Sequence, residues 1–174
     1  MADLENLKFP IGKFNAPECI TPTHIKSWIE VIKDFPKRIQ TAVEGLSPEE
    51  LEKTYRPNGW TIRQVVHHCA DSHINNLIRF KLALTENTPT IKPYAENLWA
   101  ELADYNTPIE SSLKILEGIH ERWIELLEHL NETDLEKKFL HPESNELIAL
   151  KQNIGIYAWH CNHHLAHILI ARNS

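Results

Sequence analysis

Residues 154–168 read Ile-Gly-Ile-Tyr-Ala-Trp-His-Cys-Asn-His-His-Leu-Ala-His-Ile, and the pattern inside this stretch decides the fold class. At about 100° per residue on a helical wheel, its apolar side chains form one continuous arc. The members of this arc are Ile154, Tyr157, Ala158, Cys161, Leu165 and Ile168. The stretch therefore predicts a helix, from about Leu147 to Arg172, that turns the arc toward a hydrophobic core.

The same helix carries four of the eleven histidines of the chain. His160 and His164 are four residues apart, so their imidazoles lie one turn apart on one face and can share a metal ion. On the wheel His164 flanks the apolar arc and His160 lies one step farther out, whereas His163 and His167 fall toward solvent. His160 and His164 are therefore the predicted ligands. The alternative is a helix with unligated histidines on its polar side.

A third ligand is expected from a facing helix, because catalytic sites of this kind usually combine three protein ligands with one open position. The helix predicted from Thr61 to about Thr85 offers His67, His68 and His73. Its periodicity does not decide between His67 and His68. His73 falls inside the apolar arc and is expected to be a core histidine bonded to a neighbour. The other histidines are scattered and expected at the surface: His24, His120, His129 and His141.

Hydroxyl residues and prolines mark the starts of the other long helices. Thr21-Pro22 opens a helix with apolar residues up to Val43, which Pro36 is expected to kink. Thr61 is followed by Gln64 in a capping box. Thr107-Pro108-Ile109-Glu110 predicts another capping box and a helix to about Leu130.

Shorter elements are expected between the long helices. Residues 47–50 predict a short helical turn, and residues 96–102 predict a short helix. Residues 137–146 contain turn-forming residues and predict a loop that can hold a short hairpin. The first twenty residues look irregular and are expected to wrap the outside of the domain.

Four substantial helices without a convincing run of alternating strands predict an all-α four-helix bundle, and residues 1–174 form a single domain. The net charge of −6 and the absence of a basic patch argue against nucleic-acid binding. No stretch approaches the roughly 18 apolar residues of a membrane span, and no signal segment is visible. Three scattered cysteines fit a reducing cytoplasm, and Cys69 and Cys161 are expected to be buried small hydrophobes.

Two segments with histidines, residues 59–73 and residues 157–168, resemble the DinB/YfiT-like family. The stretch RFKLALTENTPTIKPYAENLWAEL at residues 79–102 looks like the YfiT branch of that family. The resemblance implies an up-down-down-up bundle, a metal ion held by three histidines, and a homodimer. It places the third ligand at His68, with Asp71 following it in the family pattern. It also implies a metal-dependent hydrolase or a transferase that uses a low-molecular-weight thiol.

One divalent ion on three neutral imidazoles keeps its full charge and an open position, and histidine ligands suit zinc or nickel. Such an ion lowers the pKa of bound water or favours the thiolate of a bound thiol. Asp71, one turn from His68, is a candidate general base or a partner that orients an imidazole. Together with the transferase that the family resemblance implies, the lack of an obvious base favours a metal-dependent thiol S-transferase that acts on small electrophiles. The alternatives are a metal-dependent hydrolase and a stress module that binds metal or ligand without turnover.

Overall fold

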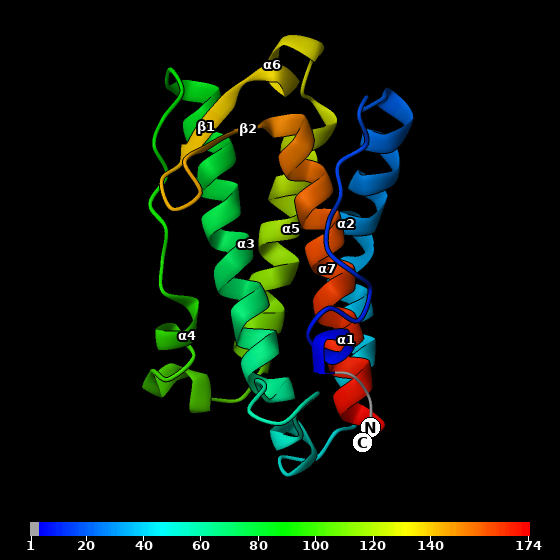
Figure 1. Ribbon diagram of the computed structural model, residues 1–174. Helices are drawn as coiled ribbons and strands as arrows, with labels where there is room; N and C mark the ends of the chain where they lie inside the picture. Colours follow the sequence, from blue (N-terminus) through cyan, green and yellow to red (C-terminus); the bar gives the residue numbers. More distant parts are fainter. Residues whose placement is uncertain (1–3) are drawn as a thin grey trace.

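Four long helices form the body of the computed structural model, which describes residues 4–174 (Figure 1). They are α2 (Pro22–Val43), α3 (Ile62–Thr85), α5 (Glu110–Glu128) and α7 (Leu150–Arg172). Helices α2 and α3 each pack against both α5 and α7, so α2 and α3 occupy opposite corners of the bundle. The prediction of an all-α four-helix bundle is confirmed.

Helices α2 and α7 run in one direction, and α3 and α5 run in the other (Figure 1). The C-terminal ends of α2 and α7 lie together, because Arg172 donates a hydrogen bond to the carbonyl oxygen of Ala42 at 2.9 Å. The first turns of α3 and α5 also meet, because the ring of His67 lies 2.7 Å from Ser112 Oγ. The order of the helices is therefore up-down-down-up, as the family resemblance implied.

Helices α3 and α5 are consecutive and parallel, so they need a long connection. Residues 86–109 provide it and return along the outside of the bundle (Figure 1). This crossover contains α4 (Glu96–Trp99) and a 3-10 turn at Ala103–Asn106. Another 3-10 turn, Glu50–Glu52, precedes α3. The crossover joins the hairpin described next through a bridge between Thr90 and Leu140.

The connection from α5 to α7 contains a short helix, α6 (Glu132–Glu136), and an antiparallel hairpin of β1 (Lys138–His141) and β2 (Glu146–Ala149). Helix α6 was not anticipated from the sequence. The last helix begins at Leu150 and not at Leu147, because residues 146–149 pair with β1. The expected hairpin is therefore present.

Of the capping boxes predicted at Thr61 and Thr107, the first is present and the second is not. Thr61 and Gln64 form the expected capping box at the start of α3. The capping box predicted at Thr107 is wrong, since α5 has Ile109 at its N-cap and no side-chain cap. The hydroxyl of Thr107 donates instead to the carbonyl of Asp104 at 2.6 Å and closes the preceding 3-10 turn.

The N-terminal strap, defined here as α1 (Leu4–Lys8) and residues 9–20, crosses the outer face of α7 (Figure 1). The indole of Trp159 donates to the carbonyl of Gly12 at 3.0 Å. A Cβ atom at Gly155 would lie 2.9 Å from the rings of Phe14 and Trp28, so glycine allows this close approach. Within residues 4–174, no helix is long and apolar enough to cross a membrane.

Candidate metal centre

The antiparallel contact between α3 and α7 brings the rings of His68, His160 and His164 together. Nε2 of His68 lies 3.4 Å from Nε2 of His160. The ring centroids of His68 and His164 are 4.7 Å apart, and those of His160 and His164 are 4.4 Å apart. One nitrogen from each ring lies within 4.8 Å of the others. The three predicted ligands therefore converge. The rings of His160 and His164, four residues apart on α7, lie side by side as expected.

The separation of these nitrogens fits a divalent ion with imidazole ligands. Bonds of 2.0–2.1 Å at tetrahedral angles hold two ligand nitrogens about 3.3–3.4 Å apart. The Nε2 atoms of His68 and His160 are separated by this distance. His68 and His164 are buried and His160 is half-buried, so one side of the group remains open.

His67 lies apart from the three converging rings and contacts the start of α5 instead. Its Nδ1 lies 2.7 Å from Ser112 Oγ and its Nε2 lies 3.1 Å from the carbonyl of Thr107. Both nitrogens are therefore used to join α3 to the start of α5. Of these two neighbouring histidines, His68 is the one that faces His160 and His164 on α7.

A chain of histidines behind His160 determines which of its nitrogens carries a proton. The carbonyl of Ile32 can only accept, so Nδ1 of His120 donates to it at 2.7 Å. Nε2 of His120 is then an acceptor, and Nδ1 of His73 donates to it at 2.6 Å. By the same logic, Nδ1 of His160 donates to Nε2 of His73 at 3.2 Å. The lone pair of His160 is therefore on Nε2, toward His68.

His73 is a core histidine bonded to its neighbours, as predicted, and it is fully buried. The prediction that His120 lies at the surface is wrong, because only 2% of it is exposed. It packs between Phe35 and Trp123 in the centre of the bundle. Helix α5 thereby contributes to the site without touching it.

A second chain stands behind His164. Nε2 of His167 donates to the carbonyl of Lys8 at 3.3 Å, which makes its Nδ1 an acceptor. Nδ1 of His164 lies 3.4 Å from this acceptor and is its donor. The lone pair of His164 is therefore on Nε2. The ring of His167 also stacks on Tyr55 at a centroid distance of 3.8 Å.

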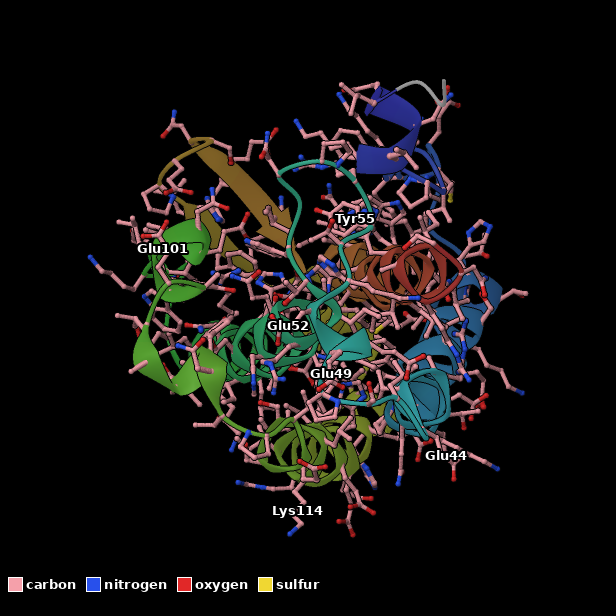
Figure 2. All side chains as sticks on the ribbon, turned by 90° about the horizontal axis from the view of Figure 1, so that it is seen from below. Glu44, Glu49, Glu52, Tyr55, Glu101 and Lys114 are labelled. Atoms are coloured by element: carbon pink, nitrogen blue, oxygen red, sulfur yellow. The ribbon has the colours of Figure 1, made fainter. Side chains whose placement is uncertain are left out.

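The predicted exposure of His163 and His167 is wrong, because both are buried. The N-terminal strap and the loop before α3 cover this side of α7. His163 lies between Trp159, at 4.4 Å between centroids, and Phe9, at 6.0 Å. Figure 2 looks along the bundle from the end where α7 finishes, and it shows Tyr55 in the loop beside that helix.

The proton assignments above require neutral imidazoles, and burial provides them. Burial lowers the pKa of His120 to about 4 and that of His167 to about 3. Burial also lowers the pKa values of the two ligand candidates on α7, His160 and His164, well below the ordinary value. Near neutral pH each ring is therefore one donor and one acceptor.

His68 differs from its two neighbours because no residue within 4–174 accepts or donates at its Nδ1. Its orientation depends on packing instead. The ring of Trp60 lies 4.6 Å from it between centroids, and 6.5 Å from that of His164. Burial lowers the pKa of His68 to about 4.

The open side of the three histidines faces a cleft of about 570 Å³. The strap, the loop before α3 and the crossover contribute to its walls, including Phe9, Tyr55 and Glu96. A second cavity of about 710 Å³ lies on the other side of His160, and Glu96 borders both. Partial burial and then the charge of Glu143 raise the pKa of the Glu96 carboxyl. Sequence reasoning missed Glu96, because no local motif ties α4 to α7.

Asp71 does not line either cavity. Its carboxylate accepts a hydrogen bond from the hydroxyl of Tyr105 at 2.7 Å. Burial raises the pKa of this carboxyl, and the bond from Tyr105 lowers it. The position argues against the predicted role as a base at the three histidines, because Asp71 points to the crossover and not to α7.

The cysteines of the bundle are not placed for chemistry. Cys69 and Cys161 are fully buried, as expected, and burial raises the pKa of both thiols. Neither lines the cleft. A nucleophile at this centre would therefore come from solution.

Known proteins are similar to this chain in sequence. The family model of the DinB superfamily matches residues 32–168. A protein of Oceanobacillus iheyensis, named as a candidate metal-dependent hydrolase, is 54% identical over 94% of each chain. A protein of Bacillus cereus with the same description is 50% identical over 97% of each chain.

Solved structures agree with these matches. YfiT from Bacillus subtilis, described as a probable metal-dependent hydrolase with an unusual four-helix bundle topology, superposes with a TM-score of 0.93. It is 44% identical and covers 97% of each chain. A mycothiol-dependent maleylpyruvate isomerase has a TM-score of 0.67 at 14% identity, over 83% of this chain and 60% of its own. This second likeness shows the fold alone.

Proposed function

This chain belongs to the DinB superfamily and is a metal-dependent enzyme, and we propose that it transfers a low-molecular-weight thiol to a small electrophile. The proposed ligands of its divalent ion, zinc or nickel, are His68, His160 and His164. The observation that carries the proposal is the pair of histidine chains that leave lone pairs on Nε2 of His160 and of His164. Nε2 of His160 faces Nε2 of His68, and the rings of all three histidines line the cleft.

When bound, the ion would supply a positive charge that lowers the pKa of a thiol or a water molecule in its open position. Neutral imidazoles do not cancel that charge. His73 and His167 hold the two rings of α7 in the required tautomer. Trp60 and the N-terminal strap restrict access of water to one side of the group.

A thiol is proposed as the nucleophile, and not water, because Asp71 does not supply a base beside the histidines. A small thiol has a pKa of about 8.5, so a nearby positive charge suffices to ionise it at neutral pH. Water starts from about 15.7 and benefits from a base as well. Asp71 is bonded to Tyr105, outside the cleft, and does not provide that base. In the transfer the sulfur bonds to an electrophilic carbon, the leaving group departs with its electron pair, and the thiol proton goes to solvent.

The test is the conjugation of bacillithiol or glutathione to 1-chloro-2,4-dinitrobenzene by protein loaded with zinc or nickel. The product is a thioether plus chloride, which absorbance and mass spectrometry follow. His164→Ala should lower both metal content and rate by about 100-fold or more, since one of three ligands is lost. His129→Ala, on the exposed end of α5, is the matched control and should change neither. No conjugation by metal-loaded protein with any of several thiols would refute the transferase.

Hydrolysis is the second candidate, and Glu96 is the observation that favours it. This carboxylate borders both cavities beside His160, and a raised pKa makes it a stronger base. The names of the relatives from Oceanobacillus and Bacillus point the same way. Glu96→Gln separates the two reactions: hydrolysis of an activated ester should fall at least tenfold, whereas thiol conjugation should persist.

A further inference from the structure

The cavity on the far side of His160 contains nitrogen atoms that lack partners. Nε of Arg79 and Nδ1 of His141 are buried without a hydrogen-bond partner among residues 4–174, and both side chains line this cavity. Nδ2 of Asn76 is also buried and unpartnered. Asn76 uses its oxygen to accept from Asn153, which lines the cavity. Two buried nitrogens on side chains that line one cavity, with a third on Asn76 behind Asn153, indicate that an acceptor group belongs there.

Arg79 is the charged member of this group. It is half-buried on α3, and within the described chain no carboxylate forms an ion pair with it. Glu96 and Glu143 border the same cavity but do not come within ion-pairing distance of its guanidinium. A half-buried guanidinium left with unpaired donors is costly, and a carboxylate satisfies it best because two oxygens match its fork.

The cavity connects Arg79 with the histidine centre. Ser72 Oγ lies 3.4 Å from Nε2 of His160, and Arg79 follows seven residues later on α3, about 10 Å along the axis. Side chains on a helix lean toward its N-terminus, which directs Arg79 back toward His160. Arg79 and His160 both line this cavity.

We propose that Arg79 binds a carboxylate of the substrate while its reacting thiol or electrophilic end lies at the three histidines. The inference rests on the proposed function and adds a substrate class to it: small molecules with a carboxylate up to about 10 Å from the reacting atom. His141, which lines the same cavity, supplies a further donor near the anion. An anion at this position would lie between the guanidinium and a bound cation.

Matched ligands test the proposal by direct binding. Calorimetry compares 6-mercaptohexanoate with 6-mercaptohexanol on zinc-loaded protein, since the two thiols differ only in the terminal carboxylate. The wild type should bind the acid about tenfold more tightly or better. Arg79→Gln should remove this preference without changing the affinity for the alcohol or the zinc content. Arg79→Lys, which keeps the charge but not the fork, should retain part of it.

Arg122→Gln is the control for loss of one positive charge, because Arg122 is exposed on α5 and lies outside both cavities. It should keep the full preference for the acid. Equal affinities of the wild type for acid and alcohol, or an acid preference that survives Arg79→Gln, would overturn the proposal.

Ligands without a thiol separate this inference from the proposed reaction. Succinate should bind the wild type and bind Arg79→Gln at least tenfold more weakly, whether or not thiols react. Succinate binding without any thiol binding would defeat the transferase and leave the anion site standing. Thiol binding without a carboxylate preference would defeat the anion site and leave the transferase standing. Inorganic phosphate that binds more tightly than succinate would contradict the choice of a carboxylate.

Discussion

The two histidines that α7 contributes to the candidate centre are oriented in the same way but by different parts of the molecule. His160 is backed by His73 and His120, and this core chain ends on Ile32 in α2 with contacts of 3.2, 2.6 and 2.7 Å. His164 is backed by His167 alone, and this outer chain ends on Lys8 with contacts of 3.4 and 3.3 Å. The core chain has the shorter distances and joins all four long helices.

Both chains place the proton of the α7 histidine on Nδ1, but they depend on different parts of the fold. The core chain places three imidazoles among Phe35, Trp123 and Tyr157, where each unpaired nitrogen would be expensive. Breaking the core chain should therefore lower the free energy of unfolding of the bundle as well as disturb the candidate centre. The outer chain lies under the N-terminal strap, because it ends on the carbonyl of Lys8. It therefore links the centre to a segment outside the four long helices.

Acidification should have the largest effect, because it acts on both chains. The pKa of His120 is about 4 in the folded protein, and that of a histidine in an unfolded chain is about 6.5. The unfolded state therefore binds more protons between these values, so stability is full above pH 6.5 and falls as pH drops toward 4. Each such histidine contributes a slope of about 1.4 kcal/mol per pH unit. Urea unfolding of metal-free protein between pH 7.5 and 4.5 measures it; a flat profile would contradict the assignment of neutral rings.

His120→Leu should break the core chain. The carbonyl of Ile32 and the N–H of His73 would lose their partners, so the free energy of unfolding should fall by about 2–4 kcal/mol. Zinc affinity should fall about 10–100-fold because His160 is no longer held in one tautomer. Urea unfolding and competition with a chromophoric chelator measure these two quantities. His129→Leu on the same helix is the control, and unchanged zinc affinity in His120→Leu would show that the core chain does not support the site.

His167→Phe should break the outer chain while keeping the aromatic stack on Tyr55. Zinc affinity should fall about tenfold, because His164 loses the acceptor for its Nδ1. The free energy of unfolding should change by about 1 kcal/mol or less. The same two assays apply. A loss of stability as large as that of His120→Leu would remove the distinction between the two chains.

Asp71→Asn should have the smallest effect. The amide keeps an oxygen that can accept from Tyr105, so stability should change by about 0.5 kcal/mol or less. Zinc affinity and the rate of thiol conjugation should stay within about threefold of wild type, because the side chain lies outside the cleft. Steady-state kinetics decide the matter. A rate reduced by about 100-fold would restore Asp71 as a general base.

Local patterns in the sequence determined the long helices and the candidate ligand pair on α7. Apolar residues at a period of 3.6 predict α2, α3, α5 and α7, because that period is a property of the helix itself. The spacing of His160 and His164 likewise needs no knowledge of the rest of the chain. The capping box at Thr61 was predictable for the same reason, since its hydrogen bonds join residues three apart.

The tertiary structure decided which neighbours those side chains meet. A helical wheel placed His163 and His167 in solvent, but residues about 150 positions earlier cover them. Periodicity could not separate His67 from His68, because the choice depends on where α5 and α7 lie around α3. His120, Glu96 and Arg79 reach the site through the parallel pair α3 and α5 and the crossover between them. Such contacts join residues far apart in sequence, and their partners are selected by the packing of whole helices and not by any local pattern.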